Sequence, residues 1–461
     1  MAVTLSIKKE KAKWLHVPTK TATIQNKMKV KIIGGGLAGC ECAYQLLKRN
    51  VEVTLVEMKP QKFSPAHKLD TLCELVCSNS LKSNDLSTAS GLLKAELRLL
   101  DSLIVKCAEE TKVPAGNALA VDREKFSQLV TSKLNEFDNF HLISKVETNL
   151  YKGDFDALVV ATGPLTDESL LPALKGLFGD QFLYFFDAVA PIVTADTIDP
   201  EWSFVGDRYG KGDGDYVNCP MDKEQFELFW RELVTAETAQ VKDFENKDVF
   251  EGCMPIEVMA KRGQDTIRFG PLKPVGLRFK DQRPYAVVQL RKENATGTLY
   301  NLVGFQTHLK WSEQKRVFSL IPALKDAEFV RYGVMHRNTY VNSPHFLNDD
   351  FTLKSNPFVA FVGQMTGVEG YMESTLAGLV GALGVYRRVK GLQPIDFGHE
   401  TITGALTKHV STLNQDFQPM NANFGILTPL SQHIRDKSAK KQALSQRSLE
   451  KMNEILTKYE V

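Results

Sequence analysis

Two cysteines stand in surroundings that favour a reactive thiol. Cys77 opens a polar run of serine and asparagine that also carries Lys82, and Cys253 sits in a turn framed by glycine and proline. A nearby cation or helix N-terminus favours the thiolate, which is the nucleophilic form of cysteine. None of the seven cysteines forms a Cys-x-x-Cys pair, and the histidines lack zinc-binding spacing, so we expect no metal site.

A glycine-rich turn near the start of the chain has the spacing of a dinucleotide-binding fingerprint. It reads Gly34-Gly35-Gly36-Leu37-Ala38-Gly39, after an apolar strand pattern and before a helical one. Such glycines allow a tight turn, close approach to a pyrophosphate and close packing of helix on strand. The phosphates would lie at the helix N-terminus. Glu57 closes the next predicted strand, where an acid can accept hydrogen bonds from ribose hydroxyls.

Two later turns follow predicted buried strands. Thr162 and Gly163 end the strand at 156–161, and Gly363 and Gln364 follow the strand at 358–362. These strand ends resemble the second and third elements of FAD-binding flavoproteins of the glutathione-reductase type. Many members of that class carry an acid at the position of Gln364. Together with the first turn, they favour FAD over a plain nicotinamide dinucleotide.

The stretch from 257 to 316 is basic and carries aromatic residues. It holds 12 Lys and Arg against 5 Asp and Glu, with rings such as Phe269 and Trp311 interleaved. Clustered cations bind phosphates, and aromatic rings stack on unpaired bases of RNA. Lys261, Arg262 and Lys273 are therefore candidates for RNA contact. The alternative is a solvated basic face with its aromatic rings in the core.

Composition restricts the classes of protein that this chain can belong to. It has 461 residues, 43% of them apolar, and 57 basic against 55 acidic side chains, so no global field selects a partner. No run of 18 apolar residues occurs, so we expect no membrane span. Few cysteines in a long chain argue against a disulfide framework, and we expect a cytoplasmic protein with reduced thiols.

The order of the elements predicts an α/β fold: a Rossmann-like, glutathione-reductase-like FAD-binding domain interrupted by an inserted mixed α/β domain. Strand, helix and strand follow one another over 29–57, and short β-like runs dominate from about 190 to 330. We divide the chain into a disordered extension or tag (1–27), the first part of the FAD-binding domain (28–190), an inserted domain on the RNA side (191–330), the returning part of the FAD-binding domain (331–430) and a C-terminal helical tail (431–461).

Long peptides of this chain resemble one family closely. They include Glu74-Leu75-Val76-Cys77-Ser78-Asn79-Ser80-Leu81, Glu251-Gly252-Cys253-Met254-Pro255 and Arg331-Tyr332-Gly333-Val334-Met335-His336-Arg337-Asn338, with further matches at 34–41, 218–221, 269–277, 304–309 and 363–371. The resemblance is to the folate- and FAD-dependent tRNA (uracil-5-)-methyltransferases, and it runs from Met28 to about Pro429.

The resemblance implies an enzyme that makes 5-methyluridine in the T-loop of tRNA. The carbon donor would be 5,10-methylenetetrahydrofolate, and FAD would be reduced by NADH or NADPH. Uracil C5 becomes nucleophilic only after a thiolate adds at C6. The resemblance makes Cys77 and Cys253 the chemical pair. We assign Cys253 to the uracil, because it adjoins the basic stretch, and Cys77 to the flavin side, with the reverse assignment open.

The same resemblance adds His308, His336, Arg337 and Asn338 to the candidates for substrate contact. Several alternatives remain open at this point: the same chemistry on ribosomal RNA, the related FAD-dependent modifier of the tRNA wobble uridine, and a non-catalytic RNA-binding flavoprotein. We expect a monomer or a weak homodimer.

Overall fold

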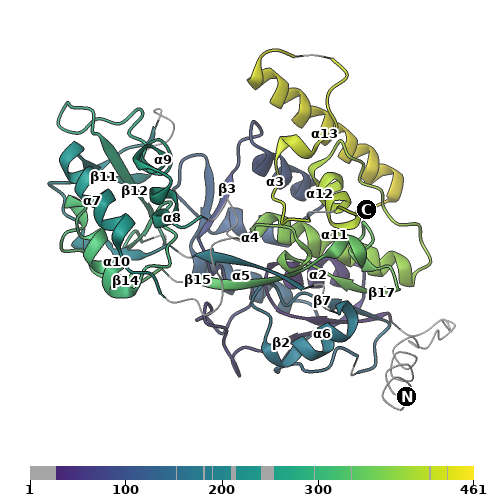
Figure 1. Ribbon diagram of the computed structural model, residues 1–461. Helices are drawn as coiled ribbons and strands as arrows, with labels where there is room; N and C mark the ends of the chain where they lie inside the picture. Colours follow the sequence, from purple (N-terminus) through teal and green to yellow (C-terminus); the bar gives the residue numbers. More distant parts are fainter. Residues whose placement is uncertain are drawn as a thin grey trace.

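A computed structural model describes most of the chain in two lobes (Figure 1). The described residues are 27–151, 153–179, 182–188, 190–208, 214–239, 254–294, 296–333, 335–414, 417–432 and 434–461. Of residues 182–188 and 335–339 only the backbone is described. The predicted extension at 1–27 lies outside the described residues, apart from its last residue.

A six-stranded sheet forms the centre of the main lobe. In spatial order its strands are β16 (Thr352–Leu353), β17 (Asn356–Phe361), β7 (Ala157–Val160), β1 (Lys29–Ile33), β2 (Glu52–Glu57) and β6 (Phe140–Ser144). All neighbours pair in parallel except β16 with β17. The chain passes from β6 to the other side of β1 before it forms β7, so the strand order reverses at β1. Ligands of such sheets bind at the carboxyl ends of the strands beside this reversal.

Helices cover both faces of this sheet. α2 (Leu37–Leu47) connects β1 to β2, and α11 (Tyr371–Val389) packs against it with a nearly continuous buried surface. The leucine pattern over 91–110 falls on two helices, because Asp101 adopts a positive φ of 61° and Ser102 caps the second one. The remaining helices of this lobe are α3 (Ala89–Leu99), α4 (Leu103–Glu110), α5 (Arg123–Asn135), α6 (Leu171–Phe178), α12 (Ile402–Ser411) and α13 (Lys437–Tyr459).

A small sheet lies beside the loop that carries Cys77. Its strands, in spatial order, are β3 (Ser80–Ser83), β5 (Ala118–Val121) and β4 (Lys112–Val113). Because β3 begins three residues after Cys77, pairing of β3 with β5 limits where the loop can lie.

The second lobe, residues 192–331, has its own sheet and its own core. The sheet is antiparallel, in the order β10 (Phe204–Val205), β11 (Tyr216–Met221), β12 (Ala286–Lys292), β13 (Leu299–Leu302), β9 (Ile192–Thr194) and β14 (Phe329–Arg331). Its helices are α7 (Lys223–Thr235), α8 (Ile256–Lys261), α9 (Gln264–Arg268) and α10 (Trp311–Phe318). Buried Phe226, Phe229, Phe305 and Phe318 belong to this core, which shares no residue with the core of the main lobe.

A two-stranded antiparallel ribbon joins the lobes. β8 (Phe182–Ala188) runs out to the second lobe and β15 (Met335–Val341) returns beside it, with Phe182 opposite Val341. The parallel sheet and its helices confirm the predicted α/β class. No helix among the described residues is long and apolar enough to cross a bilayer.

Candidate active site

A cavity opens at the carboxyl ends of β1, β2, β7 and β17, which we call the cofactor cavity. The sequence-predicted cofactor residues line it, apart from Gly39. They are Gly34, Gly35, Gly36, Leu37, Ala38, Glu57, Thr162, Gly163, Gly363 and Gln364. Four separate turns contribute these residues, and they meet because parallel strands end at one edge of the sheet.

The glycines of the first turn differ in what surrounds them. A Cβ on Gly36 would have no atom within 4 Å, and the residue has an ordinary φ of −79° at the start of α2. A Cβ on Gly39 would lie 1.9 Å from the carbonyl oxygen of Gly34. Gly39 therefore permits helix-on-strand packing, whereas Gly36 leaves open the space at the helix N-terminus where a pyrophosphate binds. The turn fits a dinucleotide such as FAD.

Glu57 is fixed by the turn that it faces. Its Oε2 accepts a hydrogen bond from the backbone nitrogen of Gly35 (2.7 Å), and its Oε1 accepts one from that of Lys59 (3.0 Å). A carboxylate has about four acceptor positions, so both oxygens can still accept from ribose hydroxyls. The sequence indicated the ribose contact, whereas the support of the glycine turn emerges only from the structure.

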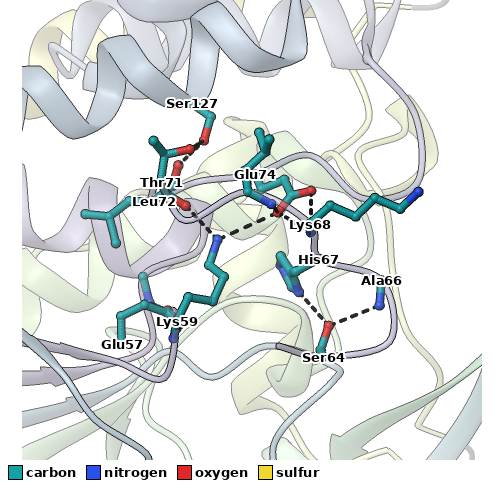
Figure 2. Close-up of polar contacts among 12 residues, drawn as sticks. Glu57, Lys59, Ser64, Ala66, His67, Lys68, Thr71, Leu72, Glu74 and Ser127 are labelled. Atoms are coloured by element: carbon teal, nitrogen blue, oxygen red, sulfur yellow. Dashed lines mark hydrogen bonds and ion pairs between the residues drawn. The ribbon is translucent and has the colours of Figure 1, made fainter. Parts of the chain in front are cut away.

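One wall of the cofactor cavity is the segment from Lys59 to Glu74, the wall loop (Figure 2). The buried Lys59 ammonium lies 3.7 Å from Glu74 Oε2 and donates to the carbonyl oxygen of Thr71 (2.6 Å). Glu74 also accepts from the backbone nitrogens of Lys68 and Leu69, each at 3.0 Å. No motif pointed to this charged pair, which ties both ends of the wall loop together.

Cys77 is next in the chain to a residue of the cofactor cavity. The preceding residue, Val76, lines the cavity, as does Tyr371 at the start of α11. The Tyr371 hydroxyl oxygen accepts hydrogen bonds from the backbone nitrogens of Cys77 (2.8 Å) and Ser78 (3.0 Å). Burial raises the pKa of Tyr371 well above its usual range, so it stays protonated. Tyr371 thereby couples the cavity to the thiol loop, by which we mean residues 74–79.

Cys77 is the only partly exposed thiol among the cysteines that the structure describes. The other described cysteines are Cys40, Cys42, Cys73, Cys107 and Cys219, all buried. Burial raises the pKa of Cys107 to about 12, and it raises the pKa values of Cys42, Cys73 and Cys219 as well. Buried thiols of this kind are unreactive.

Two arginines of the second lobe grip the thiol loop. Arg331 Nη2 donates to the carbonyl oxygen of Val76 (2.8 Å), and Arg291 donates to Ser78 Oγ (2.8 Å) and to Asn79 Oδ1 (3.1 Å). Burial lowers the pKa values of both guanidinium groups, and the nearby charge of Cys77 acts in the opposite direction. Two guanidinium groups therefore bind the thiol loop, one on each side of Cys77 in the sequence.

A third arginine reaches the loop from the main lobe. Arg123 Nη1 donates to the carbonyl oxygen of Leu75 (2.7 Å), and its Nε forms an ion pair with Glu293 of the second lobe. Asn79 Nδ2 donates to the carbonyl oxygen of Lys292 (2.9 Å). The two lobes thus meet at the thiol loop, through polar contacts on both sides of Cys77.

The candidates for RNA contact lie on the second lobe or in the ribbon. Lys261 at the end of α8 and Arg262 after it are exposed, and Lys273 is half-buried. The His308 imidazole pairs with the buried carboxylate of Glu257. The remaining candidates are His336, Arg337 and Asn338, in β15, whose side chains lie outside the described part, and Cys253, which lies outside the described residues.

The aromatic residues of the basic stretch differ in exposure, and Phe279 and Tyr285 are half-buried. Phe305 and Tyr300 are buried in the core of the second lobe, as expected if the aromatic rings of this stretch serve the core rather than RNA. Phe269 and Trp311 are 60% and 63% exposed. Alternation of basic and aromatic residues along the chain did not indicate which rings face solvent.

Comparisons with known proteins agree over most of the chain. The family model of glucose inhibited division protein A (GIDA) matches residues 29–393. Proteins described as methylenetetrahydrofolate–tRNA-(uracil-5-)-methyltransferase TrmFO match over 433 residues each. The relative from Acetivibrio thermocellus is 54% identical and that from Bacillus subtilis 50%; each alignment covers 93% of this chain and 99% of the relative.

Solved structures show the same fold at low sequence identity. GidA from Aquifex aeolicus superposes with a TM-score of 0.66 at 15% identity, over 94% of this chain and 74% of that protein. A second crystal form of the same protein gives a TM-score of 0.66 at 16% identity. These matches confirm the predicted flavoprotein-like α/β architecture.

Proposed function

Because this chain belongs to the methylenetetrahydrofolate–tRNA-(uracil-5-)-methyltransferases of the GIDA family, we propose how its own residues carry out that reaction. The enzyme methylates C5 of a tRNA uridine with a one-carbon unit from folate, and the family identified from the sequence is confirmed. The target that we propose is the T-loop uridine, with 5-methyluridine as the product and NADH or NADPH as the source of electrons.

FAD is held, in our proposal, by the turns that line the cofactor cavity. The N-terminus of α2 and Gly36 receive the pyrophosphate, Glu57 receives the ribose, and the turns at Gly163 and Gly363 lie along the rest of the cofactor. Bound FAD, once reduced, supplies the hydride that converts the transferred methylene group into methyl. The protein contributes position and the exclusion of water.

A thiolate is the group that the chemistry requires from the protein. When the sulfur bonds to C6, the C5–C6 π electrons move onto the C4 carbonyl oxygen, and C5 becomes able to attack the folate methylene carbon. The C5 proton then passes to a base, and the bond between the methylene carbon and the folate nitrogen breaks, so that tetrahydrofolate leaves. The thiolate leaves C6 after the methylene group has been reduced to methyl. Since C5 must also reach the flavin, the thiols that serve this chemistry have to lie close to the cofactor cavity.

Cys77 satisfies this requirement, and its position carries the proposal. It adjoins the cavity-lining Val76, it is partly exposed, and Arg291 and Arg331 flank its loop. We propose that Cys77 is a reacting thiol of the site. The assignment of Cys253 to C6 and of Cys77 to the flavin side stays a prediction from the sequence, and adduct trapping tests it as described in the Discussion.

The overall function is tested with the holoenzyme and unmodified tRNA transcript. Incubation with 5,10-methylenetetrahydrofolate and either NADH or NADPH should yield 5-methyluridine, measured by mass spectrometry of nucleosides. Ribosomal RNA in a parallel reaction is the competing substrate. Product in ribosomal RNA alone would contradict a tRNA target, and no product in either RNA would contradict the methyltransferase function.

A further inference from the structure

Three aromatic rings form a parallel stack that runs from the core of the second lobe to its surface. Phe329 packs on the core, and its ring lies 5.6 Å from that of Tyr332 with an angle of 10° between planes. Tyr332 in turn stacks on Trp311 at 5.8 Å and 16°. Trp311 ends the stack and is 63% exposed. We call these three residues the aromatic platform; they belong to β14, the turn after it and α10 (Figure 1).

The platform is rigid because a buried side chain locks its two segments together. Gln314, one turn after Trp311 in α10, donates from Nε2 to the carbonyl oxygen of Gly333 (2.8 Å) and accepts from the Gly333 nitrogen (2.7 Å). This reciprocal pair fixes the residue next to Tyr332 against the helix that carries Trp311. An aromatic surface held in this way loses little conformational entropy when a flat ring stacks on it.

The same segment reaches the thiol loop. Arg331, the neighbour of Tyr332, donates to the carbonyl oxygen of Val76, the residue before Cys77. The platform is therefore connected to the reacting thiol through one residue of β14. Lys315 is exposed four residues after Trp311, on the same face of α10, where its ammonium can meet a phosphate.

We propose that Trp311 binds an unpaired RNA base next to the target uridine by extending the stack with that base; this inference rests on the proposed function. Single-stranded loops are read by bases that stack on aromatic rings, with cations on the adjoining backbone. The parallel ring planes, the open end of the stack and Lys315 match a flat base that carries a phosphate. The contact of Arg331 to Val76 connects the platform to the thiol loop, so we place that base beside the target uridine.

The experiment uses the holoenzyme and a T-arm hairpin with 2-aminopurine next to the target uridine, because stacking quenches 2-aminopurine fluorescence. Wild-type protein should quench the probe. Trp311→Ala should abolish the quenching and weaken binding by about 5- to 140-fold, as expected for one lost base stack, and should raise KM more than it lowers kcat. Trp311→Phe should keep most of both signals.

Controls separate this inference from the function on which it rests. Trp202→Ala removes a 39% exposed tryptophan from the same lobe and should leave quenching and affinity unchanged. FAD content should be equal in all variants. If Trp311→Ala binds RNA and quenches the probe as well as the wild-type protein does, Trp311 does not bind an RNA base. If the wild-type enzyme also forms 5-methyluridine, the proposed function is unaffected by that result. Loss of self-association on size exclusion with unchanged RNA affinity would assign the platform to a protein contact and overturn it too.

Discussion

The hydroxyl oxygen of Tyr371 lies 2.8 Å from the backbone nitrogen of Cys77, across 294 residues of sequence. Tyr371 is the first residue of α11 and lines the cofactor cavity, so a helix that contributes to the cavity wall also positions the thiol loop. Cofactor site and thiol are therefore parts of one hydrogen-bonded unit.

Tyr371→Phe tests this unit. The change leaves the backbone N–H groups of Cys77 and Ser78 without their acceptor, which costs about 1–3 kcal/mol for each buried donor. We expect a lower Tm and a several-fold slower methyl transfer with FAD still bound, measured by melting, turnover and flavin absorbance. Tyr386→Phe, on the same helix but outside the cofactor cavity, is the control. Wild-type turnover in Tyr371→Phe would contradict the coupling.

Gly36→Val should give a folded protein without FAD. The space beside Gly36 is open and its φ suits any residue, so the chain tolerates the side chain, but the pyrophosphate loses its place. The absorbance of bound flavin after purification measures this. Gly39→Val is the matched comparison: its Cβ would overlap the Gly34 carbonyl, so it should fail to fold. A fully yellow Gly36→Val protein would refute our placement of the pyrophosphate.

The two thiols are distinguished by RNA that carries 5-fluorouracil at the target. Fluorine at C5 blocks the proton loss that releases the enzyme, so the thiol that adds to C6 stays covalently attached. If Cys253 attacks, Cys253→Ala should form no slowly migrating RNA–protein band on a denaturing gel, while Cys77→Ala still forms one and fails only in methylation. The opposite pattern of bands would assign the attack to Cys77. Loss of the band in both variants would mean that each thiol depends on the other.

Reversal of charge at Lys261, Arg262 and Lys273 should weaken RNA binding and flatten its dependence on salt. Each lost phosphate contact lowers the slope of log affinity against log salt by about 1. FAD content should not change. Reversal of the three exposed lysines Lys437, Lys440 and Lys441 of α13 changes the net charge equally and serves as the control. If both triple variants show the same slope, these residues form only a solvated face.

Lys94 should make stability depend on pH. Its ammonium is buried and donates to the carbonyl oxygens of Leu81 and Ser90, and burial lowers its pKa to about 7. The unfolded lysine keeps its proton up to about pH 10.4, so unfolding takes up a proton between these values and stability rises with pH there. Lys94→Met removes this pH-dependent contribution to the free energy of unfolding. The Tm of Lys94→Met minus that of wild type should therefore be larger at pH 6 than at pH 9; an equal difference would contradict the titration.

Local sequence patterns were sufficient to predict much of the fold. The glycine turn, its flanking strands and Glu57 lie within thirty residues of one another, so their spacing alone indicates a β-α-β unit. The ends of β7 and β17 could be added because parallel strands present their carboxyl ends at one edge of the sheet. The α/β class and the family were predicted correctly from such segments.

Contacts between distant segments were not predictable in the same way. Nothing in the sequence pairs Arg331 with Val76, or Arg291 with Ser78, because more than two hundred residues separate the partners. The ribbon of β8 and β15 was missed for the same reason. The exposure of Trp311 and the burial of Phe305 depend on which side of the second lobe each ring faces. Both rings lie in the same basic stretch, so its amino-acid composition could not distinguish them.

The ribbon also bears on how such an enzyme can evolve. The second lobe departs through β8 and returns through β15, and the bases of these strands, Phe182 and Val341, are paired neighbours. The whole second lobe is therefore inserted between two points of the chain that lie side by side, and it has a core of its own. A gene can gain, lose or exchange such an inserted lobe without any change in the strand order of the six-stranded sheet of the main lobe. In our proposal the second lobe binds the RNA, so selection of the RNA and the redox chemistry could change independently of each other, although the two lobes meet at the thiol loop.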